Sequence, residues 1–135
     1  MVSLSPALVR QAVRFGIVGV GNTLLTYVLT LGLTSGASLA VAPASALGYA
    51  AGVAQSFVLN RFWTFGVAPG GSRAVTGQLA GFIIVNLLCG GLFTLVTTVA
   101  APRLGLAPAT LLGVVIATPV NFVLTRRFVF AVRER

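Results

Sequence analysis

The sequence has no histidine, no lysine and no aspartate, and it has one glutamate, Glu134, and one cysteine, Cys89. An enzyme needs side chains that exchange protons, attack a substrate or hold a metal ion. An acid–base pair, a catalytic triad or a metal cluster cannot be assembled from this set, and Cys89 has no basic partner. We therefore expect a protein that is not an enzyme and has no catalytic residues, no metal and no cofactor. Cys89 is expected to act as a small apolar residue.

Charge is also scarce, since 7% of the residues are charged and 57% are hydrophobic. An ordinary soluble domain has roughly 25% charged residues. A helix that crosses a bilayer needs about 20 apolar residues. The longest stretch without charge has room for two such helices and a turn, and two further stretches have room for one each. The sequence therefore predicts an all-α membrane protein with four transmembrane helices, near Phe15–Ser35, Ala44–Asn60, Gln78–Ala100 and Ala109–Thr125.

Glycine and proline indicate where the turns lie, because both interrupt apolar helical patterns. Turns are predicted at Gly36–Pro43, Gly66–Gly77 and Ala101–Pro108. Ser5 and Pro6 predict a helix start, with serine as the N-cap and proline at the first helical position. The apolar stretch that follows is too long for the core of a cleaved signal peptide.

The basic residues are all arginines, and they indicate an orientation in the membrane. In a four-helix layout eight of the nine fall on one side, and Arg103 falls on the other. Because loops rich in arginine stay cytoplasmic, both termini are expected inside. The net charge of +8 is therefore mainly a signal of topology. Since the charges flank spans and form no continuous stripe, we expect no nucleic acid partner. The eight are Arg10, Arg14, Arg61, Arg73, Arg126, Arg127, Arg133 and Arg135.

A nine-residue pattern occurs twice at a constant shift along the chain, as FVLNRFWTF at Phe57–Phe65 and FVLTRRFVF at Phe122–Phe130. Asn22 and Asn86 stand at nearly the same shift. We infer one domain, residues 1–135, built from two repeats of two helices each, about 10–65 and about 74–130. Each repeat is a hairpin that enters and leaves on one side. The repeats are therefore parallel, unlike the inverted repeats of many secondary transporters.

The predicted spans contain neutral amides and no aspartate, glutamate, lysine, arginine or histidine. Carriers coupled to protons or cations usually hold an ionisable residue within the membrane, so this class is disfavoured. Each amide could form a hydrogen bond between helices, and as a set the amides could bind sugar hydroxyls. Trp63 could stack on a sugar ring or belong to an aromatic belt at the inner interface. The amides are Asn22, Gln55, Asn60, Asn86 and Asn121.

Three arginines at the inner helix ends are candidates for phosphate binding, because guanidinium groups form paired hydrogen bonds with phosphate. They could also serve only to anchor the helices at the inner interface. The three are Arg61, Arg126 and Arg127.

Three segments resemble the GtrA-like family: Phe15–Thr23, Asn60–Phe65 and Asn121–Phe130. The resemblance covers nearly the whole chain. It implies a multi-pass protein of the bacterial inner membrane that moves polyprenyl-phosphate-linked sugars from the cytoplasmic to the outer leaflet for polysaccharide synthesis. Glycosyltransferases often act beside such proteins and are expected partners. Many relatives carry an acid about where Thr26 stands, and its absence puts carboxylate-based coupling in doubt.

On this interpretation Arg61 and Arg126 bind the phosphate, while Asn60 and Asn121 contact the sugar. Four helices make a narrow passage for a sugar, which favours a homodimer. An alternative remains open, in which the protein is a membrane scaffold that recruits or stabilises a glycosyltransferase and transports nothing.

Overall fold

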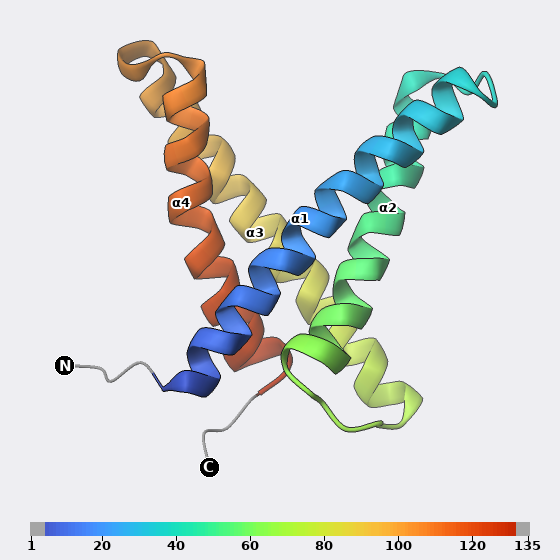
Figure 1. The fold of residues 1–135 in the computed structure, drawn as a ribbon, viewed down its shortest axis with the longest axis vertical. Coiled ribbons are helices and arrows are strands. Elements are labelled where there is room, and N and C mark those ends of the chain that lie inside the picture. Colours follow the sequence, from blue (N-terminus) through green and yellow to red (C-terminus); the bar gives the residue numbers. More distant parts are fainter. Residues whose placement is uncertain (1–4, 132–135) are drawn as a thin grey trace. The chain divides into compact units, whose positions relative to one another are not determined.

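A computed structural model describes residues 5–131 of the chain, apart from the side chains of Ser72 and Arg73. Arg133, Glu134 and Arg135 lie outside the described residues. All regular structure in the described part is helical, and the four predicted helices are present (Figure 1). A π-helical segment, η1 or η2, follows the second and the fourth helix directly. The elements are α1 (Pro6–Ser35), α2 (Val41–Leu59), η1 (Asn60–Thr64), α3 (Ser72–Leu104), α4 (Leu106–Leu124) and η2 (Thr125–Val129).

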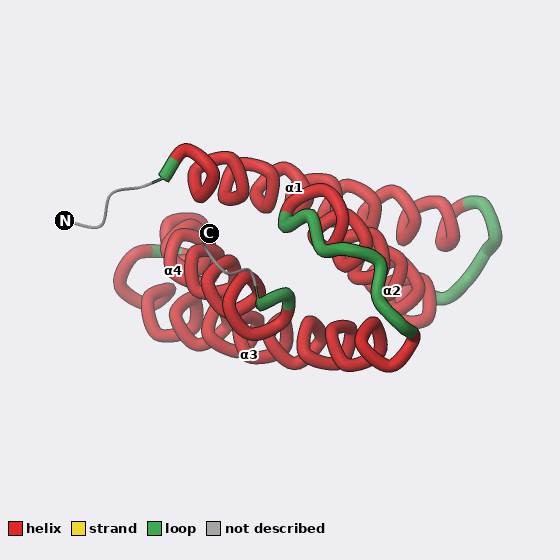
Figure 2. Tube along the Cα trace, turned by 90° about the horizontal axis from the view of Figure 1, so that it is seen from below, coloured by secondary structure: helices red, strands yellow, loops and turns green. Residues whose placement is uncertain are grey.

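The chain divides into two compact units, unit 1 (Met1–Ala68) and unit 2 (Pro69–Arg135), and each contains one helical hairpin. In unit 1, α1 packs against α2 and η1, and both views show the two long helices side by side (Figures 1 and 2). The start of α1 and the end of η1 therefore lie at the same end of unit 1. In unit 2, α3 packs against α4 and η2.

The start of α1 is as predicted. Pro6 is the first helical residue, and the Ser5 hydroxyl accepts a hydrogen bond from the backbone N–H of Leu8 at 3.2 Å. This bond satisfies one of the N–H groups that a helix leaves without a partner at its N-terminus. Ser5 therefore fixes where the helix that carries the first arginines begins.

All three predicted turns are shorter in the structure, so their predicted extents were wrong; the first ends at Ala40, because α2 begins at Val41. The third turn is reduced to Gly105, whose φ of 83° separates α3 from α4. Pro102 lies in the last turn of α3, and Pro108 lies in the first turn of α4, where a missing N–H removes no intrahelical bond. The middle loop ends early, because α3 begins at Ser72.

Close packing within each hairpin depends on glycine. A Cβ atom on Gly48 would lie 2.7 Å from Oγ1 of Thr30 and 2.8 Å from the carbonyl oxygen of Thr26. In unit 2, a Cβ on Gly113 would lie 2.6 Å from Oγ1 of Thr97. Because a carbon atom cannot approach that closely, these two positions require glycine for the observed helix contact. Gly48 thus faces α1 of its own hairpin.

Three helical segments are long and apolar enough to cross a membrane, Pro6–Ser35, Ala74–Leu104 and Leu106–Val129. Large apolar side chains along them face outward, among them Leu24 and Leu87. This is the exposure expected of helices whose outer surface contacts lipid. The remaining described helix, α2, is rich in alanine and glycine and contains Gln55. Whether α2 also crosses the membrane stays a prediction.

The two units share local structure at constant offsets along the chain. The segments η1 and η2 lie 65 residues apart, and each is closed by a phenylalanine whose N–H bonds to the carbonyl five residues earlier. Gly66 and Ala131 follow, with φ of 60° and 48°. Among the described residues, these features occur at the same place in both repeats of the nine-residue pattern.

Phenylalanine pairs extend the correspondence to the first helix of each unit. The rings of Phe15 and Phe65 lie 6.2 Å apart, and those of Phe82 and Phe130 lie 6.4 Å apart. Phe82 follows Phe15 by 67 residues. At this offset the position of Asn22 corresponds to Cys89, whereas the sequence analysis had aligned Asn22 with Asn86.

Candidate functional site

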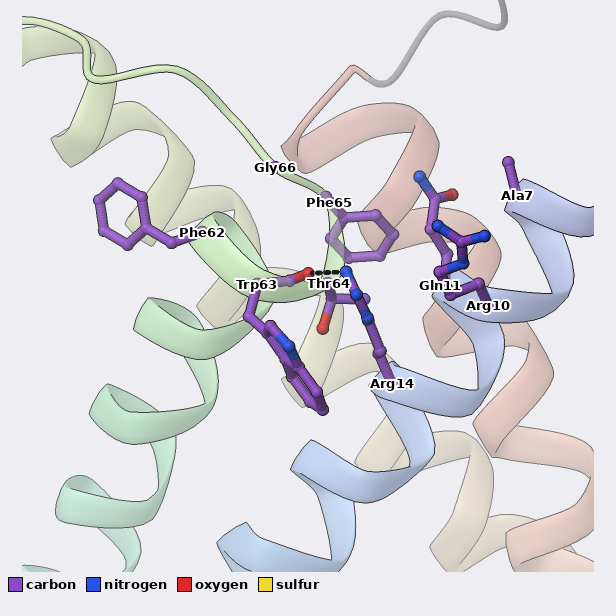
Figure 3. Close-up of a pocket in the computed structure, with 9 residues that line it drawn as sticks. All are labelled: Ala7, Arg10, Gln11, Arg14, Phe62, Trp63, Thr64, Phe65 and Gly66. Atoms are coloured by element: carbon purple, nitrogen blue, oxygen red, sulfur yellow. Dashed lines mark hydrogen bonds between the residues drawn. The ribbon is translucent and has the colours of Figure 1, made fainter.

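A pocket of about 260 Å³ opens in unit 1, between the first turns of α1 and the end of η1. Figure 3 shows its lining, to which α1 contributes the basic and amide side chains. The aromatic side chains come from η1 and from Phe65, which follows it. No acidic residue occurs among these lining residues, so the charge of the arginines is not neutralised within the pocket. Such a site attracts anions. The lining consists of Ala7, Arg10, Gln11, Arg14, Phe62, Trp63, Thr64, Phe65 and Gly66.

Arg14 connects the two sides of the pocket. Its Nη1 donates a hydrogen bond to the carbonyl oxygen of Trp63 at 2.8 Å, drawn as a dashed line in Figure 3. Its guanidinium carbon lies 5.2 Å from the centre of the Trp63 ring, which is a cation–π contact. Arg10 stands one helical turn earlier and is exposed. Two guanidinium groups therefore line the pocket, and one of them is already oriented.

Thr64 contributes a hydroxyl to the same pocket. The side chain is 3% exposed, and Oγ1 has no hydrogen-bond partner. Figure 3 shows it between Trp63 and Arg14. A buried polar atom without a partner costs roughly 1–3 kcal/mol, and such atoms in native proteins call for an explanation such as a ligand or a water molecule. Its position on a π-helical turn is also typical of functional sites.

Arg61 lies outside this lining, although it was a predicted phosphate ligand. The residue is 4% exposed, and its Nη2 donates to the carbonyl oxygen of Ala68 at 3.3 Å. The guanidinium carbon also lies 4.9 Å from the centre of the Phe62 ring. Arg61 thus holds the loop that follows η1. Its contact with phosphate stays a prediction.

The other two predicted phosphate ligands lie in η2 of unit 2. Arg126 is half-buried and has interaction partners within the chain. Arg127 is exposed, with its guanidinium carbon 5.9 Å from the centre of the Phe128 ring. A phosphate contact of either arginine also stays a prediction.

The amides of unit 2 form a chain of hydrogen bonds between α3 and the end of α4. Oγ1 of Thr125 donates to Oδ1 of Asn121 at 3.0 Å, and Nδ2 of Asn121 donates to Oδ1 of Asn86 at 3.3 Å. Nδ2 of Asn86 donates in turn to the carbonyl oxygen of Phe82 at 2.8 Å. Interhelical bonds of this kind stabilise membrane helices by about 1 kcal/mol each. Two of the predicted sugar ligands therefore already bond to each other.

The amides of unit 1 are less fully bonded, and one of them is buried. Asn60 is 1% exposed and donates from Nδ2 to Oγ of Ser56 at 3.2 Å, while its Oδ1 has no partner. Asn22 and Gln55 also carry buried side-chain oxygens without partners. The hydroxyl of Thr26 donates to the carbonyl oxygen of Gly48 at 3.3 Å. Thr26 thus supports the contact between α1 and α2.

Comparison with known proteins identifies the chain. The family model of the GtrA/DPMS transmembrane domain matches residues 14–130. The chain belongs to this family. The resemblance inferred from three short segments is thereby confirmed, and the chain is a membrane protein with several apolar helices.

A curated relative of this GtrA/DPMS domain is the protein from Bacillus subtilis (strain 168) described as "Uncharacterized membrane protein YngA". The two sequences are 35% identical over 79 residues, which is 58% of this chain and 51% of that protein. The matched region thus spans about half the length of the relative.

The sequence analysis missed the pocket of this GtrA/DPMS domain, although it identified Trp63. Arg10 and Arg14 served only to orient the helices, and Gln11 and Thr64 were not considered. The four-residue spacing of the two arginines was a usable signal, because such residues lie on one face of a helix. The missing information was that Trp63, 49 residues further on, lies opposite that face.

Proposed function

We propose that this GtrA/DPMS domain moves a polyprenyl-phosphate-linked sugar from the cytoplasmic to the outer leaflet of the bacterial inner membrane, for polysaccharide synthesis or glycosylation. The observation that carries the proposal is the acid-free pocket lined by Arg10 and Arg14. The cargo combines an apolar tail, an anionic phosphodiester and a head rich in hydroxyl groups. Guanidinium groups suit the phosphate, and outward-facing apolar helices suit the tail.

In this proposal the phosphate binds Arg10 and Arg14, and Arg61 holds the loop beside the pocket. Trp63 is proposed to stack on the sugar. Its side chain is 40% exposed, although the guanidinium group of Arg14 lies over the ring. Further proposed sugar contacts are the amides whose side-chain oxygens are buried without partners, Asn60, Asn22 and Gln55, and the bonded pair Asn86 and Asn121. As the sugar passes, Asn86 and Asn121 would have to exchange their hydrogen bond to each other for bonds to the sugar. The side-chain oxygens without partners would accept hydrogen bonds from sugar hydroxyls.

The proposed topology has four spanning helices in two parallel repeats, with both termini cytoplasmic. The distribution of the arginines supports it, since loops rich in arginine stay inside. The matching π-helical ends of the two hairpins support a duplicated hairpin. The start of α1 and the end of η1 then lie at the cytoplasmic interface, where the lipid-linked sugar is made.

Transport in this direction needs no bound proton. Moving one negative charge outward across an inside-negative membrane is favoured by about 2.3 kcal/mol per 100 mV. The position at which relatives are expected to carry an acid is Thr26, whose hydroxyl bonds to a backbone carbonyl. The proposed protein is accordingly a carrier without catalytic residues.

The test is reconstitution of the purified chain in liposomes with a fluorescent polyprenyl-phosphate sugar. A membrane-impermeant quencher then measures how fast the lipid in the inner leaflet becomes accessible. The intact chain should accelerate this exchange, and the Arg10→Gln/Arg14→Gln double variant should slow it at least tenfold. Arg103→Gln, on the opposite side of the proposed layout, is the matched control. An intact chain that accelerates nothing but retains a glycosyltransferase from its host membrane would replace this proposal with the scaffold.

A further inference from the structure

The pocket of unit 1 has a counterpart in unit 2 that can be located residue by residue. Because η2 follows η1 by 65 residues, Trp63 and Thr64 correspond to Phe128 and Val129. Both members of each pair occupy the same positions of their π-helical turns. The hydroxyl and the indole of the first pocket are thus replaced by a branched aliphatic side chain and a phenyl ring.

The first helices of the two units, α1 and α3, also differ at the positions of the two pocket arginines. At the offset of 67 residues given by the phenylalanine pairs, Arg10 and Arg14 correspond to Gly77 and Gly81. A contact within unit 2 supports this register, because a Cβ on Gly81 would lie 3.7 Å from Cγ2 of Val129. The equivalent residues of unit 1 line one pocket together. Unit 2 therefore keeps the local backbone but has glycine at the places of the two arginines of α1. Arg127, at the place of Phe62, is exposed, and its guanidinium carbon lies 5.9 Å from the centre of the Phe128 ring.

We propose that the phosphate-binding site is confined to unit 1, so that each chain binds one phosphate head group. Arg10, Arg14 and Thr64 determine this, against Gly77, Gly81 and Val129 in unit 2. The inference rests on the proposed function for the identity of the pocket as the head-group site. The number of head groups bound per chain, however, is independent of whether the lipid is then transported.

Thr64 adds a short-range contact to the attraction of the two arginines. Its hydroxyl has no partner in the chain, and Thr64 lines the pocket together with Arg14 and Trp63. A phosphate oxygen drawn in by Arg10 and Arg14 can accept the hydrogen bond that Thr64 has available. Val129 matches threonine in branching at Cβ but offers no donor. With valine in place of threonine, unit 2 has no hydroxyl at this position to donate a hydrogen bond to a phosphate.

The probe is farnesyl phosphate, titrated into the full chain in detergent, with farnesol as the uncharged comparison. Trp63 is the sole tryptophan, so its fluorescence reports occupation of this pocket. Native mass spectrometry counts bound probe molecules. We expect one farnesyl phosphate per chain, at least tenfold weaker binding in Arg14→Gln, and a change of less than twofold in Arg103→Gln.

Introducing the arginines and the threonine of unit 1 into unit 2 tests whether these three residues are sufficient for phosphate binding. Gly77 has open space around its Cβ position, and Gly81 makes only an ordinary contact, so a side chain can begin at either position without a clash at Cβ. The variant Gly77→Arg/Gly81→Arg/Val129→Thr should bind two farnesyl phosphates per chain. Unchanged affinity at Trp63 shows that this variant is folded. If it is not folded, Gly81→Arg/Val129→Thr takes its place.

Three results would overturn the inference: two farnesyl phosphates on the original chain, a folded triple variant that still binds one, or binding lost in Arg126→Gln but retained in Arg14→Gln. The outcome is separable from that of the transport assay. One head group per chain without lipid movement would reject the proposed transport and leave this inference standing. Two head groups per chain together with lipid movement would reject this inference and leave the proposed transport standing.

Discussion

Thr64 lines the pocket of unit 1 with a hydroxyl that is buried and has no partner. Valine keeps the branching at Cβ and removes the polar atom. Thr64→Val should therefore raise the free energy of unfolding by about 1 kcal/mol, since an unpaired buried group costs roughly 1–3 kcal/mol. It should also weaken farnesyl phosphate binding several-fold. Thermal unfolding in detergent and the Trp63 titration measure the two effects.

The control for this substitution is Thr23→Val, at an exposed threonine whose hydroxyl already bonds to the carbonyl oxygen of Gly19. We expect Thr23→Val to leave the affinity unchanged. Equal affinity in Thr64→Val and the original chain would show that the hydroxyl takes no part in binding.

Arg61 and Arg14 differ in burial and should differ in what their loss affects. Arg61 is buried and bonds to the carbonyl oxygen of Ala68. We expect Arg61→Gln to lower the free energy of unfolding by roughly 1–3 kcal/mol, because that carbonyl loses its donor. Arg14→Gln should lower the affinity for farnesyl phosphate more than the stability. A stable Arg61→Gln variant that no longer binds the probe would instead favour the direct phosphate contact predicted from the sequence.

At the scale of the helices, the sequence predicted which helices exist better than it predicted the residues at which they begin and end. Long stretches without charge and one serine–proline pair sufficed to place four helices and the start of α1. Proline was a poor guide to boundaries, because Pro108 lies in the first turn of its helix and interrupts nothing there. The single residue that separates α3 from α4 is Gly105, the one position of that turn with positive φ.

The site was harder to predict than the helices, for two physical reasons. A π-helical turn adds a residue to the repeat of the helix and so changes the direction of the side chains that follow, including Trp63 and Thr64. The contact between Arg14 and Trp63 also depends on how α1 and α2 are registered. That register is set by close approaches such as the one at Gly48, which residue type alone does not reveal.

The role of Gly48 can be tested by adding one methyl group. Gly48→Ala should destabilise unit 1 by roughly 1–3 kcal/mol, because its Cβ would overlap Thr30 and the backbone of Thr26. Gly19→Ala is the matched control in the same hairpin, since a Cβ there meets no atom within 4 Å. It should be neutral or stabilising by up to about 1 kcal/mol. Equal unfolding temperatures for the two variants would contradict packing through Gly48.

For the whole molecule, the topology depends on α2. The other three long helices are apolar and long enough to span a membrane, whereas α2 is the one that connects the turn after Ser35 to η1. If α2 spans, the first turn and the pocket of unit 1 are on opposite sides of the membrane. If it does not, η1 stays on the side of the first turn, which a spanning α1 separates from Arg10 and Arg14. The pocket could not form, and the hairpins could not be parallel spanning repeats.

Labelling of single cysteines decides between these arrangements. In a Cys89→Ser background, Ala37→Cys lies before α2 and Ala68→Cys lies after η1, and both positions are exposed. A membrane-impermeant maleimide applied to intact cells should modify residue 37, and it should modify residue 68 only after the membrane that holds the protein is permeabilised. The physical reason is the excess of arginine on the side of residue 68. Modification of both residues in intact cells, or of neither, would mean that α2 does not cross the membrane. Trp63 would then be separated by the membrane from Arg14, to which it bonds in this structure. The pocket on which the proposed export rests could not form.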